Sequence, residues 1–504
     1  MMNNPISSPG TALGRGTSIE NRLKALGRDH TIRFLTLGVL FSFPAFAFIR
    51  SFYMTDPDFG WHLRAGQWIL LHHGVPHTDP FSSYGAGKPW YDYSWLFDIF
   101  FAGLYKWFGL QGFALLEVAA RVAIPACLYR MAQRIGENFW ISAIASTAAS
   151  YSMWAIYAPR PGMFTIVFFA LELEILFGAL LSGNTRRLWL LPPLFWLWAG
   201  IHIQFVYGLI VLALFAGERI LNGAIHYKSQ IAALPAKTIW IFAACVVATL
   251  VTPYGWHLYS TVIQYAGQTH IYESISEMLA VNFRQPFHFV FLFLTLGSAL
   301  ALGWSRQMRP LYLLLFTFAA TIGFRSVKDV WLLGTVSVAL IALSLRPTES
   351  NHTPTSALSP RHRLALAVCV IAVLAVAWLR YDVNNTWIEM GLAGKYPEAA
   401  AQYVEKNHLQ GPLYNDFSAG GFLIWRLPSL PVSIDGRTNV HGDDRVKAYS
   451  DVLRGFPGWE KNPELSSARL IIWPTKSPLV GLLRCDTRFQ QVFSDPQATV
   501  FVRR

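Results

Sequence analysis

Two aspartates two residues apart, Asp56 and Asp58, follow the first long apolar segment of this chain in the stretch TDPDFGWHLR. In many sugar-transferring enzymes a D-x-D pair holds a divalent cation against a diphosphate. A carboxylate at the edge of a bilayer is also partly desolvated, which suits it to act as a general base toward a hydroxyl. We therefore predict a catalytic acid pair led by Asp58. The competing interpretation is two solvated loop acids, one of which caps a helix that begins at Phe59.

The elements that position this pair belong to a membrane protein. The chain has 504 residues, of which 53% are hydrophobic and 14% charged, and its mean hydropathy is +0.34. This apolar fraction exceeds what a soluble domain can bury in a core. The net charge is +12, but the Lys and Arg residues form short clusters between apolar segments and no continuous basic stripe, so we expect no nucleic-acid partner.

About eleven apolar segments are candidates to span a bilayer, allowing for short or tilted members. They cover residues 34–50, 111–131, 138–156, 162–182, 187–201, 204–221, 237–252, 286–304, 310–324, 329–345 and 364–380. If residues 1–33 are cytoplasmic, every cytoplasmic segment is basic, as the positive-inside rule requires. The loop 51–110 is then external, and its aromatic-rich segment 93–108 is predicted to lie flat on the membrane surface.

The hydropathy after Arg380 falls to that of a small soluble domain. A helix is predicted over residues 397–408, and strands at 412–415, at 468–473 and between 492 and 502. Strands that alternate with helices indicate an α/β domain, so the expected fold is an α-helical polytopic membrane domain (34–381) followed by an external α/β domain (382–504). No complete nucleotide-binding fingerprint is present in the sequence.

Motifs along most of the chain resemble those of bacterial GT-C-type membrane glycosyltransferases, the group that includes the protein O-mannosyltransferase-like proteins. The first external loop reads DPDFGWHLRAGQWILLHHGVPHTDPFS and then PWYDYSWL, and it is followed by APRPGMF at 158–164, WAGIHIQF at 198–205 and TPYGWHLY at 252–259. GGFLIW and SIDGR in the tail are similar to signatures of an uncharacterised bacterial subgroup. The chain departs from the pattern at Gly200, Ile203, Thr252 and Ser94, where Asn, Gly or an acid is usual.

The resemblance implies a GT-C-like enzyme of the bacterial inner membrane that takes a sugar from a polyprenyl phosphate. The acceptor would be a glycan, lipid or protein of the cell envelope on the periplasmic face, and a divalent cation, if one is needed, would bind Asp56 and Asp58. Asp58, with Asp56 and Asp79, would serve as the base. Residues that would contact the leaving phosphate are Arg160, Arg325, Lys328, His202 and Arg64. For the arginines and the lysine the alternative is anchoring to lipid headgroups, and for His202 it is a hydrogen-bonded residue at a helix end.

Two other classes of protein stay open on the sequence alone: a transporter of a polyprenyl-linked or amphipathic substrate, and a non-catalytic envelope-assembly protein whose tail binds a partner. Two pairs of acids are also left without a settled role. Glu172 and Glu174 fall inside a predicted span, where an ionisable group is costly. Glu273 and Glu277 are possible acids on the acceptor side, although a solvated helix face is the favoured interpretation for both.

Overall fold

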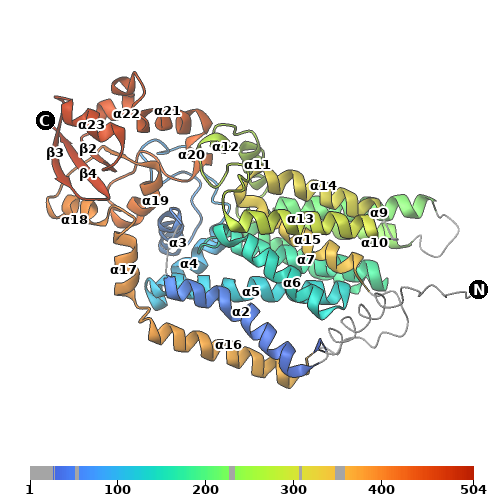
Figure 1. Cartoon of the computed structure of the whole chain (residues 1–504). Coiled ribbons are helices and arrows are strands. Elements are labelled where there is room, and N and C mark those ends of the chain that lie inside the picture. Colours follow the sequence, from blue (N-terminus) through green and yellow to red (C-terminus); the bar gives the residue numbers. More distant parts are fainter. Residues whose placement is uncertain (1–25, 28, 52–55, 226–232, 306–308, 347–357) are drawn as a thin grey trace, which may run out of the picture.

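A computed structural model describes residues 26–27, 29–51, 56–225, 233–305, 309–346 and 358–504. Its long helices run side by side in a bundle, and a small domain of helices and strands sits at one end of that bundle (Figure 1). Most of the predicted N-terminal segment 1–33 lies outside the described residues.

Each of the eleven predicted spans coincides with a helix. The helices are α2 (His30–Ser51), α5 (Gln111–Gly136), α6 (Phe139–Ser152), α7 (Gly162–Ser182), α8 (Leu191–Ile201), α9 (Phe205–Ile225), α10 (Ala233–Leu250), α13 (Pro286–Trp304), α14 (Pro310–Arg325), α15 (Val330–Ser344) and α16 (Pro360–Arg380). Among the described residues, six helices are long and apolar enough to cross a membrane, and the segments Phe205–Glu218 of α9, Lys237–Leu250 of α10 and Pro310–Arg325 (α14) are apolar but shorter. The prediction of a polytopic α-helical membrane protein is confirmed, although α6 and α8 are shorter than a straight crossing needs.

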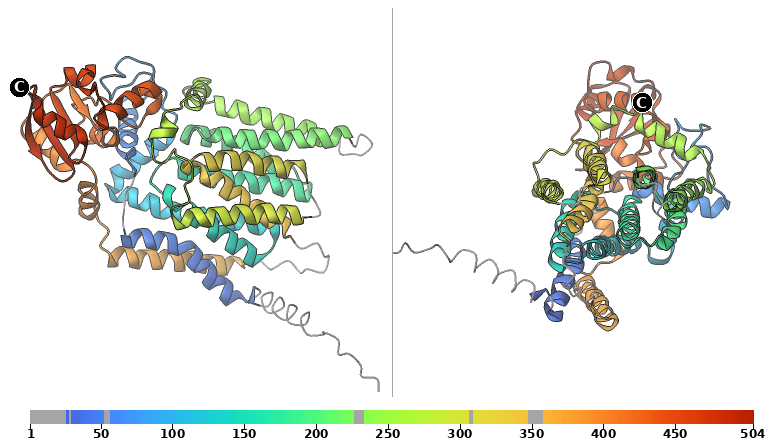
Figure 2. Two further views of the ribbon diagram at one scale, coloured as in Figure 1. Left: turned by 45° about the horizontal axis from the view of Figure 1, so that its top comes forward. Right: turned by 90° about the vertical axis from the view of Figure 1, so that its right-hand side faces the viewer.

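Helix α15 forms the centre of the bundle. It packs against α5, α6, α7, α13 and α14, and its residues are apolar on every side, as expected of a helix enclosed by others. At the edge of the bundle α2 and α16 lie against each other (Figures 1 and 2). Local signals begin several of these helices: Asn138 accepts a hydrogen bond from the Ile141 amide at the start of α6, and prolines open α13, α14 and α16.

The first loop folds into two helices, α3 (Phe59–His72) and α4 (Trp95–Phe108), which pack on each other. Their backbones come so close that a Cβ on Gly66 would lie 1.9 Å from the Asp98 carbonyl oxygen. Helix α4 also contacts α5 and α8, while Phe100, Trp107 and Phe108 remain exposed. Exposed aromatic side chains suit the membrane surface that the sequence predicts for this segment.

The tail forms a mixed α/β domain around a four-stranded sheet. The strands are β1 (Leu413–Asn415), β2 (Leu470–Pro474), β3 (Phe489–Ser494) and β4 (Ala498–Arg503), in the order β1-β2-β4-β3. β1 pairs parallel to β2, and the other two pairings are antiparallel. The helices of the tail are α17 (Asn385–Ala393), α18 (Glu398–Lys406), α19 (Phe417–Arg426), α20 (Thr438–His441), α21 (Asp443–Leu453), α22 (Pro463–Ser467) and α23 (Pro478–Cys485). The predicted helix and strands are confirmed, and the GGFLIW motif is part of α19.

Candidate active site

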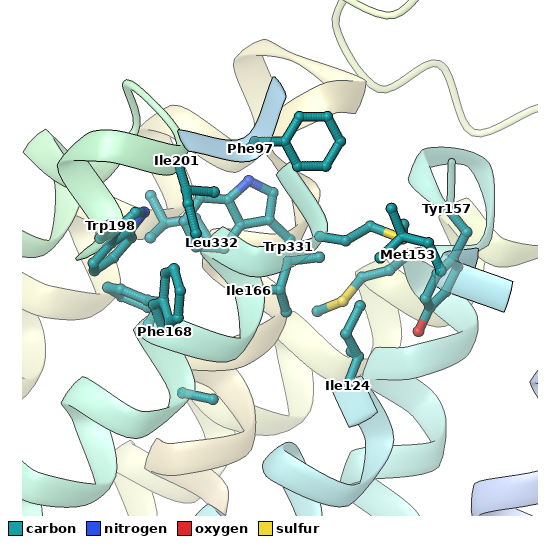
Figure 3. Close-up of a cluster of buried hydrophobic side chains, with 14 of the residues drawn as sticks. Phe97, Ile124, Met153, Tyr157, Ile166, Phe168, Trp198, Ile201, Trp331 and Leu332 are labelled. Atoms are coloured by element: carbon teal, nitrogen blue, oxygen red, sulfur yellow. The ribbon is translucent and has the colours of Figure 1, made fainter. Parts of the chain in front are cut away.

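A small cavity lies where the first loop and the loop that carries Glu277 meet one end of the bundle. It has a volume of about 70 Å³. Polar side chains reach it from several parts of the chain, namely Asp58, His62, Tyr93, Arg160, His202, Gln204, Glu277 and Lys328. Its apolar wall includes Ile166 and Trp331, which belong to the buried cluster of side chains in Figure 3. Buried apolar side chains therefore pack beneath the charged residues of the cavity.

Arg160 lies between two acidic groups of the site, Glu277 and Asp56. Its Nη1 lies 2.7 Å from Glu277 Oε2, and its Nε lies 3.5 Å from Asp56 Oδ2. Lys328 Nζ approaches the other oxygen of Glu277 at 3.5 Å. Asp56 is fully buried, so this arginine balances a carboxylate that would otherwise be costly to enclose.

Asp58 stands at the N-cap position of α3, but its side chain makes no capping hydrogen bond. The carboxylate lines the cavity instead, which argues against the helix-cap interpretation. Burial, followed by the nearby charge of Asp56, raises the pKa of Asp58 to about 7, although Arg160 and Lys328 oppose the shift. A carboxyl group that titrates near neutral pH is suited to accept a proton during a reaction.

Glu277 behaves in the opposite way. Burial disfavours its charge, but Arg160 and then Lys328 outweigh burial and lower the pKa of Glu277 to about 2. The backbone of this residue is held as well, because its carbonyl oxygen accepts hydrogen bonds from the Lys328 amide and the Ser326 hydroxyl. Glu277 is thus a permanent anion that fixes two cations at the cavity.

His62 lies one helical turn after Asp58 on α3 and also faces the cavity. Its Nδ1 shares a 2.6 Å hydrogen bond with Asp98 Oδ1 on α4, and its ring stacks on Trp61. Burial, with the charge of Arg160, holds the pKa of His62 well below its usual range, so the ring is neutral. The hydrogen bond to Asp98 fixes the orientation of the imidazole through Nδ1, and Nε2 takes no part in it.

The tail forms part of the wall around Asp58. A Cβ on Gly436 would lie 1.9 Å from Asp58 Oδ1, and one on Gly421 would lie 2.4 Å from the Pro57 carbonyl oxygen. On the α3 side, a Cβ on Gly60 would meet the Gly421 carbonyl oxygen at 2.2 Å. The GGFLIW and SIDGR motifs therefore allow the tail backbone to touch the loop that carries Asp58.

Asp79 is not brought to the cavity. It is buried, and its Oδ1 accepts a hydrogen bond of 2.6 Å from Arg437 Nη1 in the SIDGR motif. Its carboxylate also accepts hydrogen bonds from the Ser82 hydroxyl and the Phe81 amide. Arg437 in turn binds both oxygens of Asp435. The geometry gives Asp79 a role in joining the loop to the tail.

His202 lines the cavity, but its Nδ1 is hydrogen-bonded to the Thr165 hydroxyl at 2.8 Å. The same hydroxyl accepts a hydrogen bond from the Trp198 indole. This histidine directly follows α8. It therefore faces the cavity, as predicted for a phosphate contact, and is also a hydrogen-bonded residue at a helix end, as the alternative interpretation proposed.

Two predicted cations lie elsewhere. Arg325, in the last turn of α14, is exposed and places its guanidinium 4.2 Å from the centre of the Tyr272 ring. Arg64 is half-buried on α3 and is absent from the cavity wall, which within the described residues draws its cations from Arg160 and Lys328.

Several residues of the site were not predicted from the sequence. Glu277 is not on a solvated helix: it follows the short helix α12 (Ile271–Ser274), which precedes it in a loop after α11 (His257–Ala266), and its side chain turns toward Arg160. The preference for a solvated acid was wrong for Glu277, whereas Glu273 is indeed exposed. The sequence also gave no local indication that Asp98 and Gly436 belong to the site. Gly436 lies in the SIDGR motif, but that motif alone did not predict its contact with Asp58.

The acid pair does not form a metal site on its own. Asp56 is engaged by Arg160, and across the described part of the chain no three His, Cys, Asp or Glu side chains gather to hold a metal ion. The carboxylate of Asp58 shares the cavity with two cations, Arg160 and Lys328. These residues therefore fit an anionic ligand better than a divalent cation.

No family model matches the chain, and no curated protein matches it. A structural likeness covers 97% of the chain and 98% of ArnT from Cupriavidus metallidurans, whose crystal structure is in the apo state, with 14% sequence identity and a TM-score of 0.45. At this identity and TM-score, the function of the present chain has to be inferred from its own site.

Proposed function

We propose that this protein is a membrane glycosyltransferase of GT-C type that moves a sugar from a polyprenyl phosphate to a hydroxyl of a cell-envelope acceptor. The acceptor would approach from the external side. The bacterial inner membrane is the proposed location, with the tail in the periplasm.

One observation carries the proposal: a carboxyl group whose pKa is about 7 shares a small cavity with two cations. Asp58 is that group, and Arg160 and Lys328 are the cations. The cavity lies at one end of the bundle, next to the first residues of α7 and α15. A lipid-linked substrate and a water-borne acceptor can both reach such a place.

In the proposed reaction the acceptor oxygen attacks the anomeric carbon of the donor, and Asp58 removes the proton of that hydroxyl. The bond between the anomeric carbon and the phosphate oxygen breaks, and its electron pair leaves with the phosphate. Arg160 and Lys328 stabilise this negative charge. Attack opposite to the leaving group inverts the configuration of the sugar, and the products are a glycosylated acceptor and polyprenyl phosphate.

The size of the cavity adds a requirement. About 70 Å³ has room for roughly five water-sized groups, enough for a phosphate but not for a whole sugar. Binding of the donor must therefore open the cavity. The loop that carries Glu277 is the proposed moving part, because a donor phosphate competes with Glu277 for the same two cations.

The test is transfer by purified full-length protein in lipid nanodiscs, supplied with a panel of polyprenyl-phosphate sugars and isolated envelope glycans, lipids and proteins. The proposal expects one donor to yield labelled product and free polyprenyl phosphate. Lys328→Met should raise the KM for that donor, and the matched variant Glu273→Gln, at an exposed acid near the site, should not. A divalent cation and a chelator are added in parallel.

No transfer from any donor, together with a normal envelope in cells that carry only Asp58→Ala while the gene deletion is defective, would contradict the proposal. Movement of an intact lipid-linked sugar across the bilayer would favour a transporter. Specific binding of an envelope protein by a chain without transfer activity would favour an assembly role.

A further inference from the structure

A second charged cavity lies at the opposite end of the bundle from the candidate active site. It has a volume of about 510 Å³ and is lined by three arginines, Arg134, Arg187 and Arg346, together with Glu137 and Glu174. Its rim is formed at the ends of three helices: by Glu137 after α5, by Ser182 at the end of α7, and by Arg346 after α15. Nothing in the proposed transfer reaction uses these groups.

The length of α7 sets the distance between the two cavities. Gly162 at its start lines the candidate active site, and Ser182 at its end lines the second cavity. Twenty residue steps at about 1.5 Å give about 30 Å, which is the thickness of the hydrocarbon core of a bilayer. The second cavity therefore lies at the level of the other layer of lipid headgroups.

The charges of this cavity do not balance. Glu174 is paired twice, with Arg134 Nη1 at 2.5 Å and with Arg130 Nε at 3.1 Å, while Arg346 pairs with Glu137. Within the described residues Arg187 has neither a hydrogen-bonding nor an ion-pairing partner. Across the described residues, the three arginines of the wall and the adjoining Arg130 carry four positive charges against the two carboxylates of Glu137 and Glu174, a net charge of +2.

The surroundings of the cavity are those of a membrane surface. Its wall includes Gly178, Ala179 and the exposed Leu181, and the exposed side chains of Trp189 and Leu190 follow Arg187 along the chain. Tryptophan favours the headgroup level, and apolar walls suit acyl chains better than water. A soluble phosphate would gain nothing from these walls.

We propose that this arginine cavity binds the phosphate headgroup of an anionic phospholipid from the leaflet opposite the candidate active site. Basic pockets between membrane helices are known to suit doubly charged phospholipid headgroups. Glu174 holds Arg130 and Arg134 in place, while Arg187 and Arg346 face the lipid phosphate. A diphosphate headgroup such as that of cardiolipin matches the net charge.

The experiment measures lipid binding by the purified full-length protein, using native mass spectrometry and fluorescent-lipid titration. Cardiolipin and phosphatidylglycerol are compared with phosphatidylcholine, and inorganic pyrophosphate is the soluble competitor. We expect tight binding of cardiolipin, with loss of about fivefold for Arg187→Gln and about 25-fold for Arg187→Gln with Arg346→Gln. Arg361→Gln, an exposed arginine at the start of α16 outside this cavity, is the matched control and should leave the affinity unchanged.

Equal binding of cardiolipin and phosphatidylcholine, or an unchanged affinity in both the single and the double variant, would overturn the proposal. So would pyrophosphate that displaces the lipid at equal concentration, since the site would then recognise free phosphate. Arg187→Gln removes a side chain without a partner in the described structure, so folding of this variant is not at risk. The outcome is independent of whether the protein transfers sugar.

Discussion

Asp56 and Asp58 are separated by one proline, yet they have different surroundings. Asp56 is fully enclosed, beside Arg160, and its Oδ1 accepts a hydrogen bond from the Asp58 amide. Asp58 is half-buried and faces the cavity. In this arrangement Asp56 holds the loop and supplies a negative charge, whereas Asp58 is free to exchange a proton. The difference favours Asp58 as the base, as the sequence alone had already suggested.

The pH dependence of transfer follows from this contrast. Because the base form of Asp58 is the ionised one and its pKa is about 7, log kcat should rise with pH and level off above neutrality. Asp56→Asn removes a neighbouring negative charge, so the midpoint should move to lower pH by roughly one unit or more. A pH profile of kcat for both proteins measures this. A flat profile across neutral pH, or a midpoint that moves upward in Asp56→Asn, would contradict the assignment.

At the scale of elements, the active site depends on backbone contacts between α3, α4 and α19. Glycines allow each of these contacts, at Gly66 between α3 and α4 and at Gly60 and Gly421 between α3 and α19. Gly436, just before α20, does the same for the Asp58 side chain. The tail is therefore a structural part of the site and not an appendage.

Gly436→Ala tests this role of the tail. The new methyl group would overlap Asp58 Oδ1 and force the carboxylate away, and a displacement of about 1 Å lowers kcat by roughly 10- to 100-fold. Gly481→Ala is the control, because a Cβ there meets nothing within 4 Å. Wild-type kcat in a folded Gly436→Ala protein would show that the tail does not position Asp58.

Asp79→Asn separates a structural acid from a catalytic one. Loss of the charged hydrogen bond from Arg437 should lower the free energy of unfolding by about 1.5–3 kcal/mol, measured by thermal or denaturant unfolding. The pH midpoint of the remaining activity should stay where it is, since Asp79 is outside the cavity. A variant of normal stability with an altered pH profile would instead make Asp79 a participant in proton transfer.

The whole molecule is asymmetric along the bundle. The tail lies at one end of the bundle (Figure 1). The cavity of Asp58 lies at the same end, and the arginine cavity lies at the other, where α5 and α7 end. On the positive-inside rule, we propose that the arginine-rich end faces the cytoplasm. With that proposed orientation the tail would be periplasmic.

A natural cysteine reports this orientation. Cys485 is exposed at the end of α23 in the tail, Cys245 is buried, and Cys127 and Cys369 lie within the bundle helices α5 and α16. A membrane-impermeant maleimide added to intact spheroplasts should label the wild type at Cys485 and leave Cys485→Ser unlabelled. Labelling that appears only after the membrane is permeabilised would place the tail in the cytoplasm.

Much of the fold could be predicted from the sequence because it depends on local patterns. Apolar length identifies the spans, and composition identifies the tail. In the site, Asp58, Arg160, His202 and Lys328 could be chosen because each follows or precedes an apolar segment at the same end of the bundle.

The rest of the site could not be predicted because distant segments create it. His62 meets Asp98 from 36 residues away, and Arg160 meets Glu277 from 117 residues away. Gly436 touches Asp58 only because the tail folds back onto the first loop. Arg325, only three residues before Lys328, contacts Tyr272 instead of the cavity, because α14 ends at Arg325, Ser326 is extended, and Lys328 belongs to the separate turn Val327–Asp329.

The proposed mechanism requires Asp58 to accept the proton of the acceptor hydroxyl. The most direct measurement is the single-turnover rate of sugar transfer by Asp58→Asn, with donor already bound, compared with the wild type and with Asp444→Asn, an exposed acid of the tail. Asp58→Asn should bind the donor normally but transfer the sugar about 10²- to 10⁴-fold more slowly, while Asp444→Asn should behave as the wild type. A transfer rate in Asp58→Asn within a few-fold of the wild type would contradict the proposed mechanism.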